Sequence, residues 1–416
     1  MAQRRSWAGR IVPALALVAT LVAAPRAGAQ RVQALAACAP LPGSLVSPYG
    51  PGPLAARSAG PAPHAMALDE AAGRVYINTA TALLVLDAAN GACLRVAPLG
   101  GASPGPIAVD GRTHLVFAAR DTSVVAFAGA SGARLATVPA AAPVTSLLAD
   151  PAGDRVLGIS DAELLVLDGR TGALLRRAPL PHPRGTQVHA AALWSAGTVY
   201  VTEPRAIAVL DVASGALRRT LPLAAAPLYL AVDARTRHLF VTALPPGNTP
   251  ASSYSLLVTF DAATGLALHQ ERFATSWENY DSTIVAVDGP RGHLFVSSNV
   301  STMHVIDTRT GAVLASAPAG GDLPLRGALA GRSGQVFVAN LSFGRGGRPG
   351  EAQGSLSAFD PVTGAGRHLT YIGFFPSGLV VNQTTGRLFV TTIGTLVDND
   401  GVTGAGTVLV YDLKTL

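Results

Sequence analysis

The stretch HVIDTRTGAVLASAP, residues 304–318, decides the fold because the chain repeats its pattern many times. An apolar run ends in Asp307, three variable residues follow, and Gly311 opens a second apolar run. Residues 165–180 (LVLDGRTGALLRRAPL) and 208–223 (AVLDVASGALRRTLPL) follow the same pattern. An Asp carboxylate accepts backbone N–H groups two or three residues further on, and Gly takes the positive φ of a short hairpin loop. The pattern therefore predicts a tight turn between two strands.

The same turn is predicted at six places, which argues against a catalytic role because an active site does not need six separate copies. In each, the Asp ends the third strand of a unit and the Gly starts the fourth. The pairs are Asp87 with Gly91, Asp168 with Gly172, Asp211 with Gly215, Asp261 with Gly265, Asp307 with Gly311 and Asp360 with Gly364. The second unit departs from the pattern, since Gly129 is expected at the Asp position. The last unit has Asp412 but no fourth strand after it.

Eight units of about forty residues align in this way, each with four short apolar runs. The runs are rich in Val, Leu, Ile, Phe and Tyr and are bounded by Gly, Pro, Asn and Asp, as strands are. No stretch after the N-terminal segment has apolar residues at helical spacing for three turns. We therefore predict an all-β protein, a β-propeller of about eight four-stranded blades, with seven as the alternative. The N-terminal segment, around VQALAACAPL (residues 32–41), is expected to supply the closing strand.

Residues 1–29 have the pattern of a secretory signal peptide. Arg4, Arg5 and Arg10 precede an apolar run that is too short to span a bilayer, and Ala-Gly-Ala follows before Gln30. The Arg4-Arg5 pair leaves the twin-arginine export route open. The protein is therefore expected to be exported to the periplasm, the medium or the cell surface, with no transmembrane segment in the mature chain.

Three parts of the chain are predicted from these patterns. They are a signal peptide at 1–29, an N-terminal segment with the closing strand at 30–64, and a β-propeller of eight repeat units at 65–416.

Cys38 and Cys93 are the only cysteines, and export would place them where disulfides persist. An even number of cysteines without neighbouring His or Cys favours a disulfide over a metal or redox site. Such a bridge would tie the N-terminal segment to the first repeat. Two free thiols are the simpler alternative, and LAAC at residues 35–38 also resembles a lipobox, in which Cys38 would be lipidated.

The charge pattern gives no sign of nucleic-acid binding. Removal of residues 1–29 takes four arginines and no acidic residue, which lowers the formal net charge from +6 to +2. The remaining arginines are scattered, and Lys414 is the only lysine. A nucleic-acid surface would need its basic residues clustered.

Three segments carry a family resemblance: AVDARTRHLFVT (231–242), VAVDGPRGHLFVSS (285–298) and GRLFVTT (386–392). Together with the hairpins that follow, they resemble the YVTN-type β-propeller repeats of bacterial and archaeal surface and periplasmic proteins. The resemblance covers residues 65–416. It implies an exported propeller of about seven blades with binding or surface roles and without a known catalytic activity.

Pyrroloquinoline-quinone dehydrogenases are a neighbouring family of eight-bladed propellers with a similar turn. Their blades lock together through a Trp shortly after the Gly. The matching places in this chain hold Leu174, Leu217, Leu268 and Leu314, and no two cysteines are adjacent. Both differences disfavour a quinone cofactor.

The long insertions are predicted to lie on one face of the propeller, the insertion face. Loops between strands two and three and loops between blades share that face, and the longest are residues 244–255, 341–355, 393–406, 180–189, 272–282 and 369–378. Function in such proteins is carried by loops on a rigid scaffold, so this face is the predicted binding surface. The candidate ligand-binding residues are His182, Arg184, His189, Trp277, Glu278, Tyr280, Asp281, Arg345, Arg348, Phe374 and Phe375.

Metal sites have weaker support. Asp398, Asn399 and Asp400 before a Gly resemble the start of a calcium loop, but no closing Glu follows, and a plain turn fits as well. His182 and His189 share one loop, which is too few ligands for a closed zinc site. No cofactor is predicted, and calcium is kept as the alternative.

The favoured function is a non-catalytic binding or interaction scaffold that uses the insertion face. Its ligand would be a protein, a glycan or a small molecule, and the protein itself would be a monomer. The alternative is a propeller enzyme with its site at the central channel, either a lactonase-like hydrolase or a quinone-dependent oxidoreductase.

Overall fold

The computed structural model describes residues 37–40, 52–99, 103–181, 191–194, 197–246, 254–274, 282–298, 302–318, 323–342, 353–397, 401–403 and 405–416. The chain divides into two compact units, Met1–Gln33 and Ala34–Leu416. The first unit, with the predicted signal peptide, lies outside the described residues.

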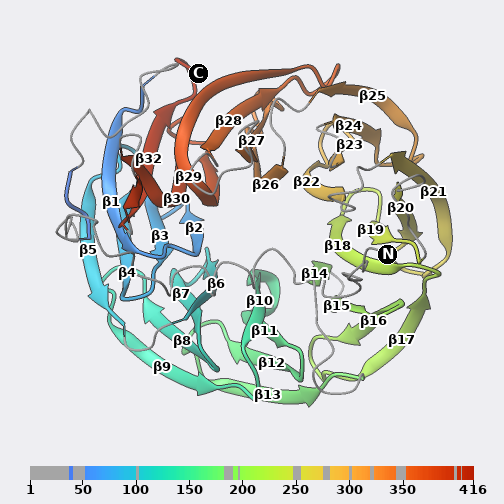
Figure 1. The fold of residues 1–416 in the computed structure, drawn as a ribbon. Coiled ribbons are helices and arrows are strands. Elements are labelled where there is room, and N and C mark those ends of the chain that lie inside the picture. The colour runs from blue at the N-terminus through green and yellow to red at the C-terminus, as the bar shows by residue number, and fades with distance from the viewer. Residues whose placement is uncertain are drawn as a thin grey trace, which may run out of the picture. The chain divides into compact units, whose positions relative to one another are not determined.

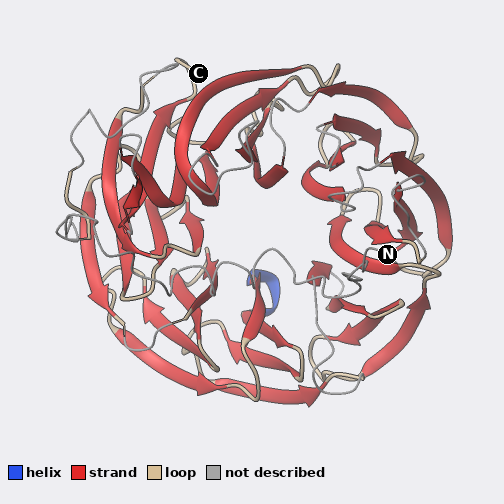
Figure 2. Cartoon of the chain, viewed as in Figure 1, coloured by secondary structure: helices blue, strands red, loops and turns tan. Residues whose placement is uncertain are grey.

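The second unit is an all-β propeller of eight four-stranded blades in a ring, as predicted (Figure 1 and Figure 2). In each blade the first strand is the inner strand, nearest the axis, and the fourth lies on the outside. Six blades are separate antiparallel sheets. Blade 1 contains β2 (Ala65–Asp69), β3 (Arg74–Asn78), β4 (Ala82–Asp87) and β5 (Cys93–Pro98); blade 2 contains β6 (Pro104–Asp110), β7 (Leu115–Arg120), β8 (Ser123–Ala128) and β9 (Arg134–Pro139); blade 3 contains β10 (Val144–Asp150), the 3-10 turn η2 (Pro151–Gly153), β11 (Arg155–Ser160), β12 (Glu163–Asp168) and β13 (Leu174–Pro179).

The next three blades follow the same order. Blade 4 contains β14 (Ala191–Trp194), β15 (Thr198–Glu203), β16 (Ala206–Asp211) and β17 (Leu217–Pro222); blade 5 contains β18 (Ala226–Asp233), β19 (His238–Leu244), β20 (Tyr254–Asp261) and β21 (Ala267–Ala274); blade 6 contains β22 (Ser282–Asp288), β23 (His293–Ser298), β24 (Thr302–Asp307) and β25 (Val313–Pro318).

Blades 7 and 8 are joined through one long strand. Blade 7 contains β26 (Leu323–Leu329), β27 (Val336–Ser342), β28 (Gln353–Phe359) and the start of β29 (Gly366–Asn382); blade 8 contains the end of β29, β30 (Arg387–Val397), β32 (Ala405–Asp412) and β1 (Ala55–Pro61), with β31 (Gly401–Thr403) paired to β30. Residues 369–378, expected as a loop between blades, are therefore part of a strand. The chain bends there through positive φ at Gly373 and Phe375, so it passes from blade to blade without leaving the sheet.

Another expected loop, residues 393–406, is also largely strand. β30 continues to Val397 and pairs with β31, in the register Thr395 with Thr403 and Val397 with Gly401. This insertion therefore extends blade 8 as a hairpin.

The core lies between the blades, because the two middle strands of each blade are covered on both faces. Every residue of β7 is buried, whereas the outer strand β13 is exposed except at Ala178. Tyr76 and Leu83 of blade 1 pack with Val116 and Phe127 of blade 2 in one apolar cluster. Burial on both faces explains why the middle strands are nearly continuous apolar runs in the sequence.

The hydrogen bonds of the repeated turn confirm its prediction. The Asp307 Oδ1 atom accepts from the backbone N–H of Arg309 at 2.9 Å and of Thr310 at 2.7 Å, and Gly311 has a φ of +77°. The backbone and side-chain hydrogen bonds from Thr264 lower the pKa of Asp261 in the same way. These carboxylates are thus committed to their own loops.

The second unit requires a correction, because Ala128 and not Gly129 stands at the Asp position. The Ala128 N–H donates to Ala133 O at 2.9 Å, and the Gly132 N–H donates to Ala128 O at 2.7 Å. These are the bonds that Asp makes elsewhere, so the alignment was shifted by one residue. Gly129 is required for space, since a Cβ there would lie 2.3 Å from His114 O.

The turn glycines also set the distance between blades. A Cβ at Gly172 of blade 3 would lie 2.3 Å from the Ala126 Cβ of blade 2, and its φ is +75°. Both observations exclude a side chain at this position. The Gly of the pattern therefore shapes its own loop and lets the preceding blade approach.

β1 closes the ring by pairing with β32, from Ala55 opposite Val410 to Pro61 opposite Ala405. The closing strand is thus downstream of the expected residues 32–41. Ala37–Pro40 lie on its other side, where the Cys38 N–H donates to Ser58 O at 2.8 Å. The middle of β1 is covered on both sides, and its small residues Ser58 and Ala59 are fully buried.

Cys38 and Cys93 form a disulfide that holds this closure. Cys93 begins β5, the outer strand of blade 1, so the bridge joins the segment beside β1 to the next blade. The Arg57 Nε–H of β1 also donates to Gly91 O at 2.7 Å. The two ends of the ring are therefore linked covalently and by hydrogen bonds.

Candidate functional site

The two faces of the ring are built differently. On the turn face the first strand of each blade turns into the second, and the third into the fourth, through short loops. On the insertion face lie the connections from strand two to strand three and from one blade to the next. Residues 245–253 between β19 and β20, and 343–352 between β27 and β28, connect strand ends on the insertion face.

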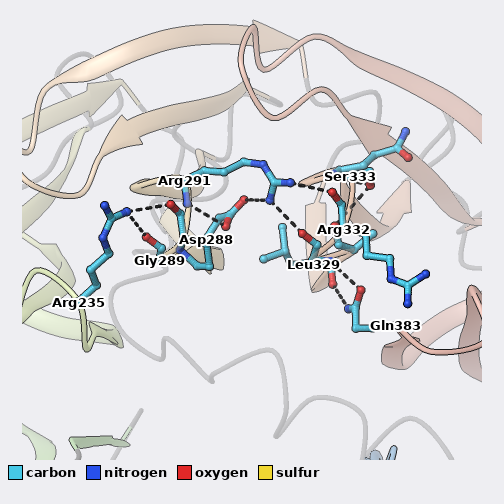
Figure 3. Close-up of polar contacts among 12 residues, drawn as sticks. Arg235, Asp288, Gly289, Arg291, Leu329, Arg332, Ser333 and Gln383 are labelled. Carbon is cyan, nitrogen blue, oxygen red and sulfur yellow. Dashed lines mark hydrogen bonds and ion pairs between the residues drawn. The ribbon is translucent and has the colours of Figure 1, made fainter.

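The polar groups of the turn face hold neighbouring blades together (Figure 3). The Arg235 Nη1 atom of blade 5 donates to Gly289 O at 3.1 Å and to Pro290 O at 2.8 Å in blade 6. The Arg291 guanidinium of blade 6 pairs with Asp288 at 2.9 Å and donates to Gly331 O at 3.0 Å in blade 7. These arginines therefore act as links between blades.

The same face continues these links around the ring. Gln383 of blade 8 donates to Leu329 O of blade 7 at 2.6 Å and accepts from the Gly331 N–H at 2.7 Å. The Thr384 N–H donates to Glu70 Oε1 of blade 1 at 2.7 Å. The His114 Nδ1 atom of blade 2 lies 2.7 Å from Asp69 Oδ2 of blade 1. Much of the polar chemistry of the turn face is thus used inside the fold.

On the insertion face, blades 1 and 2 are closed by a buried arginine. Arg120 is 2% exposed, and its Nη1 atom donates to Asn78 Oδ1 at 3.0 Å and to Thr79 O at 2.6 Å. The guanidinium therefore caps the turn between the second and third strands of blade 1. Its role is structural.

Arg326 of blade 7 differs from these arginines. In the described parts of the eight inner strands it is the only basic residue, and acidic residues stand only at the strand ends on the turn face. Its Nε–H donates to Ser377 O at 3.1 Å and its Nη1 to Leu325 O at 2.8 Å. Among the described residues no carboxylate pairs with it, and Nη2 has no acceptor. Arg326 is exposed to solvent.

The charge of Arg326 influences residues from two other blades. Burial, followed by the Arg326 charge, lowers the pKa of His64, just before β2, to about 4. Desolvation by the surrounding inner strands lowers the pKa of the Arg326 guanidinium, an effect that Tyr229 of blade 5 opposes. An arginine stays charged under such shifts, so the centre of the ring carries a cation beside a neutral imidazole at neutral pH.

This arrangement suits the binding of an anionic group. Two backbone carbonyls orient the guanidinium and leave N–H donors for a ligand, and guanidinium groups match carboxylate and phosphate oxygens in shape and charge. Tyr229, 37% exposed, occupies the corresponding position after the bulge of its own inner strand, since Arg326 pairs with Ala339 and Tyr229 with Thr242. A ligand at Arg326 would therefore find an aromatic ring on the same wall.

Most of the residues predicted for the insertion face lie outside the described residues. These are His182, Arg184, His189, Trp277, Glu278, Tyr280, Asp281, Arg345 and Arg348, together with the possible calcium ligands Asp398, Asn399 and Asp400. Phe375 is described and lies in β29, half-buried. Phe374 lies in the same strand, paired with Gly394. In the described ranges, no three His, Cys, Asp or Glu residues are grouped as a metal site would need.

Arg326 itself was missed in the sequence. The segment LPLRGAL has the composition of any strand, and nothing local marks its arginine. A signal exists only across the repeats, because none of the other inner strands, within their described ranges, carries an Arg or Lys. The ring places the charge of Arg326 near the axis.

The fold defines the class: this chain is an eight-bladed β-propeller protein. A family model described as outer membrane protein assembly factor BamB matches residues 55–249, from β1 to the segment after β19. No curated protein matches the sequence. Within the described residues, no helix has the length and apolar character needed to cross a membrane.

Solved structures with the same fold come from different settings. The computationally designed Ika8 protein matches with a TM-score of 0.60 and 16% identity, covering 88% of this chain and 99% of that one. BamB from Moraxella catarrhalis matches with a TM-score of 0.51 and 16% identity over 80% of this chain and 93% of its own. A chain of a mitotic checkpoint complex matches with a TM-score of 0.53 and 14% identity over 74% and 88%. At these identities the likeness concerns the fold alone.

Proposed function

We propose that the protein is an exported, non-catalytic binding scaffold whose insertion face holds a partner protein, with Arg326 receiving an acidic group of that partner. The observation that carries this proposal is the guanidinium of Arg326 near the axis of the ring, which pairs with no carboxylate among the described residues. A cation without such a partner has its charge available to a ligand.

A protein partner is favoured by the insertion face as a whole. The sequence predicts that the connecting segments of this face carry many aromatic and ionisable residues. Interfaces between proteins are enriched in aromatic residues and arginine. The partial match to an outer membrane protein assembly factor is consistent with such a role.

Export is supported by two features. The first is the signal-like pattern of residues 1–29. The second is the Cys38–Cys93 disulfide, a bond typical of oxidising compartments outside the cytosol.

The proposal is tested with a fluorescent oligoglutamate peptide as the probe, titrated with the mature protein at low salt. We expect the Arg326→Met variant to bind the peptide about tenfold more weakly, the value of one hydrogen bond to a charged group. Arg332→Met is the matched control, because Arg332 is exposed on the turn face and its side chain bonds none of the described residues.

Two outcomes would contradict the proposal. An equal loss in both variants would show non-specific attraction of the peptide to a basic surface. Unchanged binding in Arg326→Met would show that the acidic group does not reach this residue.

A further inference from the structure

A cavity of ≈ 200 Å³ lies between blades 4 and 5, at the outer wall of the ring. Its lining residues are Thr198, Val209, Arg218, Arg219, Ala262 and Ala263. The last two belong to the loop after β20, and the others to β15, β16 and β17. Two consecutive arginines therefore contribute to the wall of one small cavity.

Arg219 is incompletely bonded in this cavity. Its Nη2 atom donates to Ala262 O at 2.9 Å, but its Nε atom is buried and has no acceptor. Ala262 O accepts a second bond, from the Tyr200 hydroxyl at 2.7 Å, so both of its lone pairs are used. A buried donor without a partner is costly and rare in native proteins. The Nε atom is closed off from solvent, so a ligand in the cavity would interact with the charge of the guanidinium.

Arg218 and Thr198 complete the wall in a different way. The Arg218 Nε–H donates to Asp211 Oδ2 at 3.1 Å, which neutralises the Arg218 charge. Its Nη1 atom donates to Thr198 Oγ1 at 3.0 Å, so the Thr198 O–H has its own proton to donate. The charge left over at the cavity is that of Arg219, which forms no ion pair with the described residues.

We propose that this cavity binds the oxyanion group of a small ligand, a phosphate or a carboxylate, with Arg219 and Thr198 as donors. The Arg219 guanidinium and the Thr198 hydroxyl contact its oxygens, and the guanidinium balances its charge. Val209, Ala262 and Ala263 supply the apolar part of the wall. This site is separate from the insertion face and does not depend on a partner there.

The repeats provide matched controls. Arg95, Arg176 and Arg219 occupy the same register on the outer strands of blades 1, 3 and 4, opposite Val85, Val166 and Val209. Arg95 and Arg176 are exposed, whereas Arg219 is half-buried. Removal of Arg95 therefore tests a general effect of charge on this wall.

The test is calorimetric titration of the mature protein with inorganic phosphate and, separately, with acetate, at constant ionic strength. We expect saturable binding of at least one of these anions, and the stronger of the two identifies the chemistry of the ligand. Arg219→Met should weaken it about tenfold, the effect of one hydrogen bond to a charged group, and Arg95→Met should leave it unchanged.

A second variant, Thr198→Val, keeps both arginines and should weaken the same binding, so the proposal stays testable if Arg219→Met does not fold. No saturable binding of either anion would overturn the proposal. An equal loss in Arg95→Met and Arg219→Met would overturn it as well, because the binding would then be general attraction to the wall.

Discussion

Arg291 and Arg326 lie in neighbouring blades but make different contacts. Arg291, on the turn face, pairs with the buried Asp288 and donates hydrogen bonds to two carbonyls of the next blade. Arg326, on an inner strand, bonds two carbonyls and meets no carboxylate among the described residues. The inner strand of blade 6 ends in Asp288, which pairs with Arg291. Blade 7 has Ala330 at the same position, so its inner strand offers Arg326 no carboxylate. Arg291 uses its charge for structure on the turn face, whereas we propose that the charge of Arg326 serves a ligand.

The largest effect on the structural side is expected from the disulfide. Changing Cys38 and Cys93 together to Ser should lower the free energy of unfolding by about 4 kcal/mol, because a loop with a sequence separation of 55 is no longer closed. Urea denaturation measures the loss, and reduction of the wild type should reproduce it. Oligoglutamate binding at Arg326 should survive in conditions where the variant is folded. A loss of that binding from the folded variant would show that binding at Arg326 depends on the disulfide closure of the ring.

The turn glycines should come next. Gly172→Ala is expected to cost about 3 kcal/mol, the sum of a left-handed backbone and a clash with the preceding blade. Gly73→Ala is the matched control, because Gly73 also has a positive φ but nothing lies within 4 Å of a Cβ there. Its cost should be about 1–2 kcal/mol, that of the backbone alone. Equal costs would show that blade spacing does not depend on the Gly.

The comparison itself is tested by Arg291→Met and Arg326→Met. Arg291→Met leaves the buried Asp288 carboxylate without its cation and should lower the free energy of unfolding by about 2 kcal/mol. Arg326→Met loses two hydrogen bonds to carbonyls but leaves no buried carboxylate without a partner, so it should cost less, about 1 kcal/mol, while weakening oligoglutamate binding. Thermal unfolding and peptide titration of both variants measure the two quantities. The reverse order of stability losses would contradict the distinction.

A further effect appears only at low pH and concerns two histidines whose pKa values are both lowered to about 4. Burial is the main cause of the lowered pKa at both His64 and His304. Of the two, only the pKa of His64 is also lowered by the charge of Arg326. Since the folded pKa lies below the unfolded value of about 6.5, each contributes stability that is present above pH 6.5 and lost as pH falls towards 4. His304→Gln should flatten this part of the stability profile.

NMR titration of His64 and His304 tests whether an acidic peptide binds at Arg326. An acidic peptide bound at Arg326 should raise the pKa of His64, because a nearby carboxylate favours the imidazolium. The pKa of His304, which stacks on Phe273, should stay where it is. Equal shifts at both histidines would place the peptide elsewhere.

The repeats allowed most of the fold to be predicted, because each turn encodes its own geometry. Asp307 and Gly311 specify a loop through hydrogen bonds within a few residues, and the structure has those bonds. The closing strand was placed too early, since apolar character pointed to residues 32–41, whereas the fit beside β32 requires small residues such as Ser58 and Ala59. Similarly, β29 looked like a loop because its bend lies inside a strand.

The candidate site was harder to predict for a related reason. Arg326 becomes distinctive only when eight inner strands surround one axis, and Arg219 only when the loop of blade 5 covers it. Neither relation exists within a single repeat. Sequence patterns indicated the scaffold, and the packing of the blades identified its two unusual arginines.

The most direct test of the account is site-specific photo-crosslinking in the cells that make the protein. Benzoylphenylalanine is placed at Tyr229, on an inner strand near Arg326, or at Arg332 on the turn face. We expect a discrete crosslinked partner protein from the Tyr229 position, lost when Arg326→Met is added, and none from the Arg332 position. Crosslinks from Arg332 alone, or crosslinks from Tyr229 that persist in Arg326→Met, would contradict the central claim.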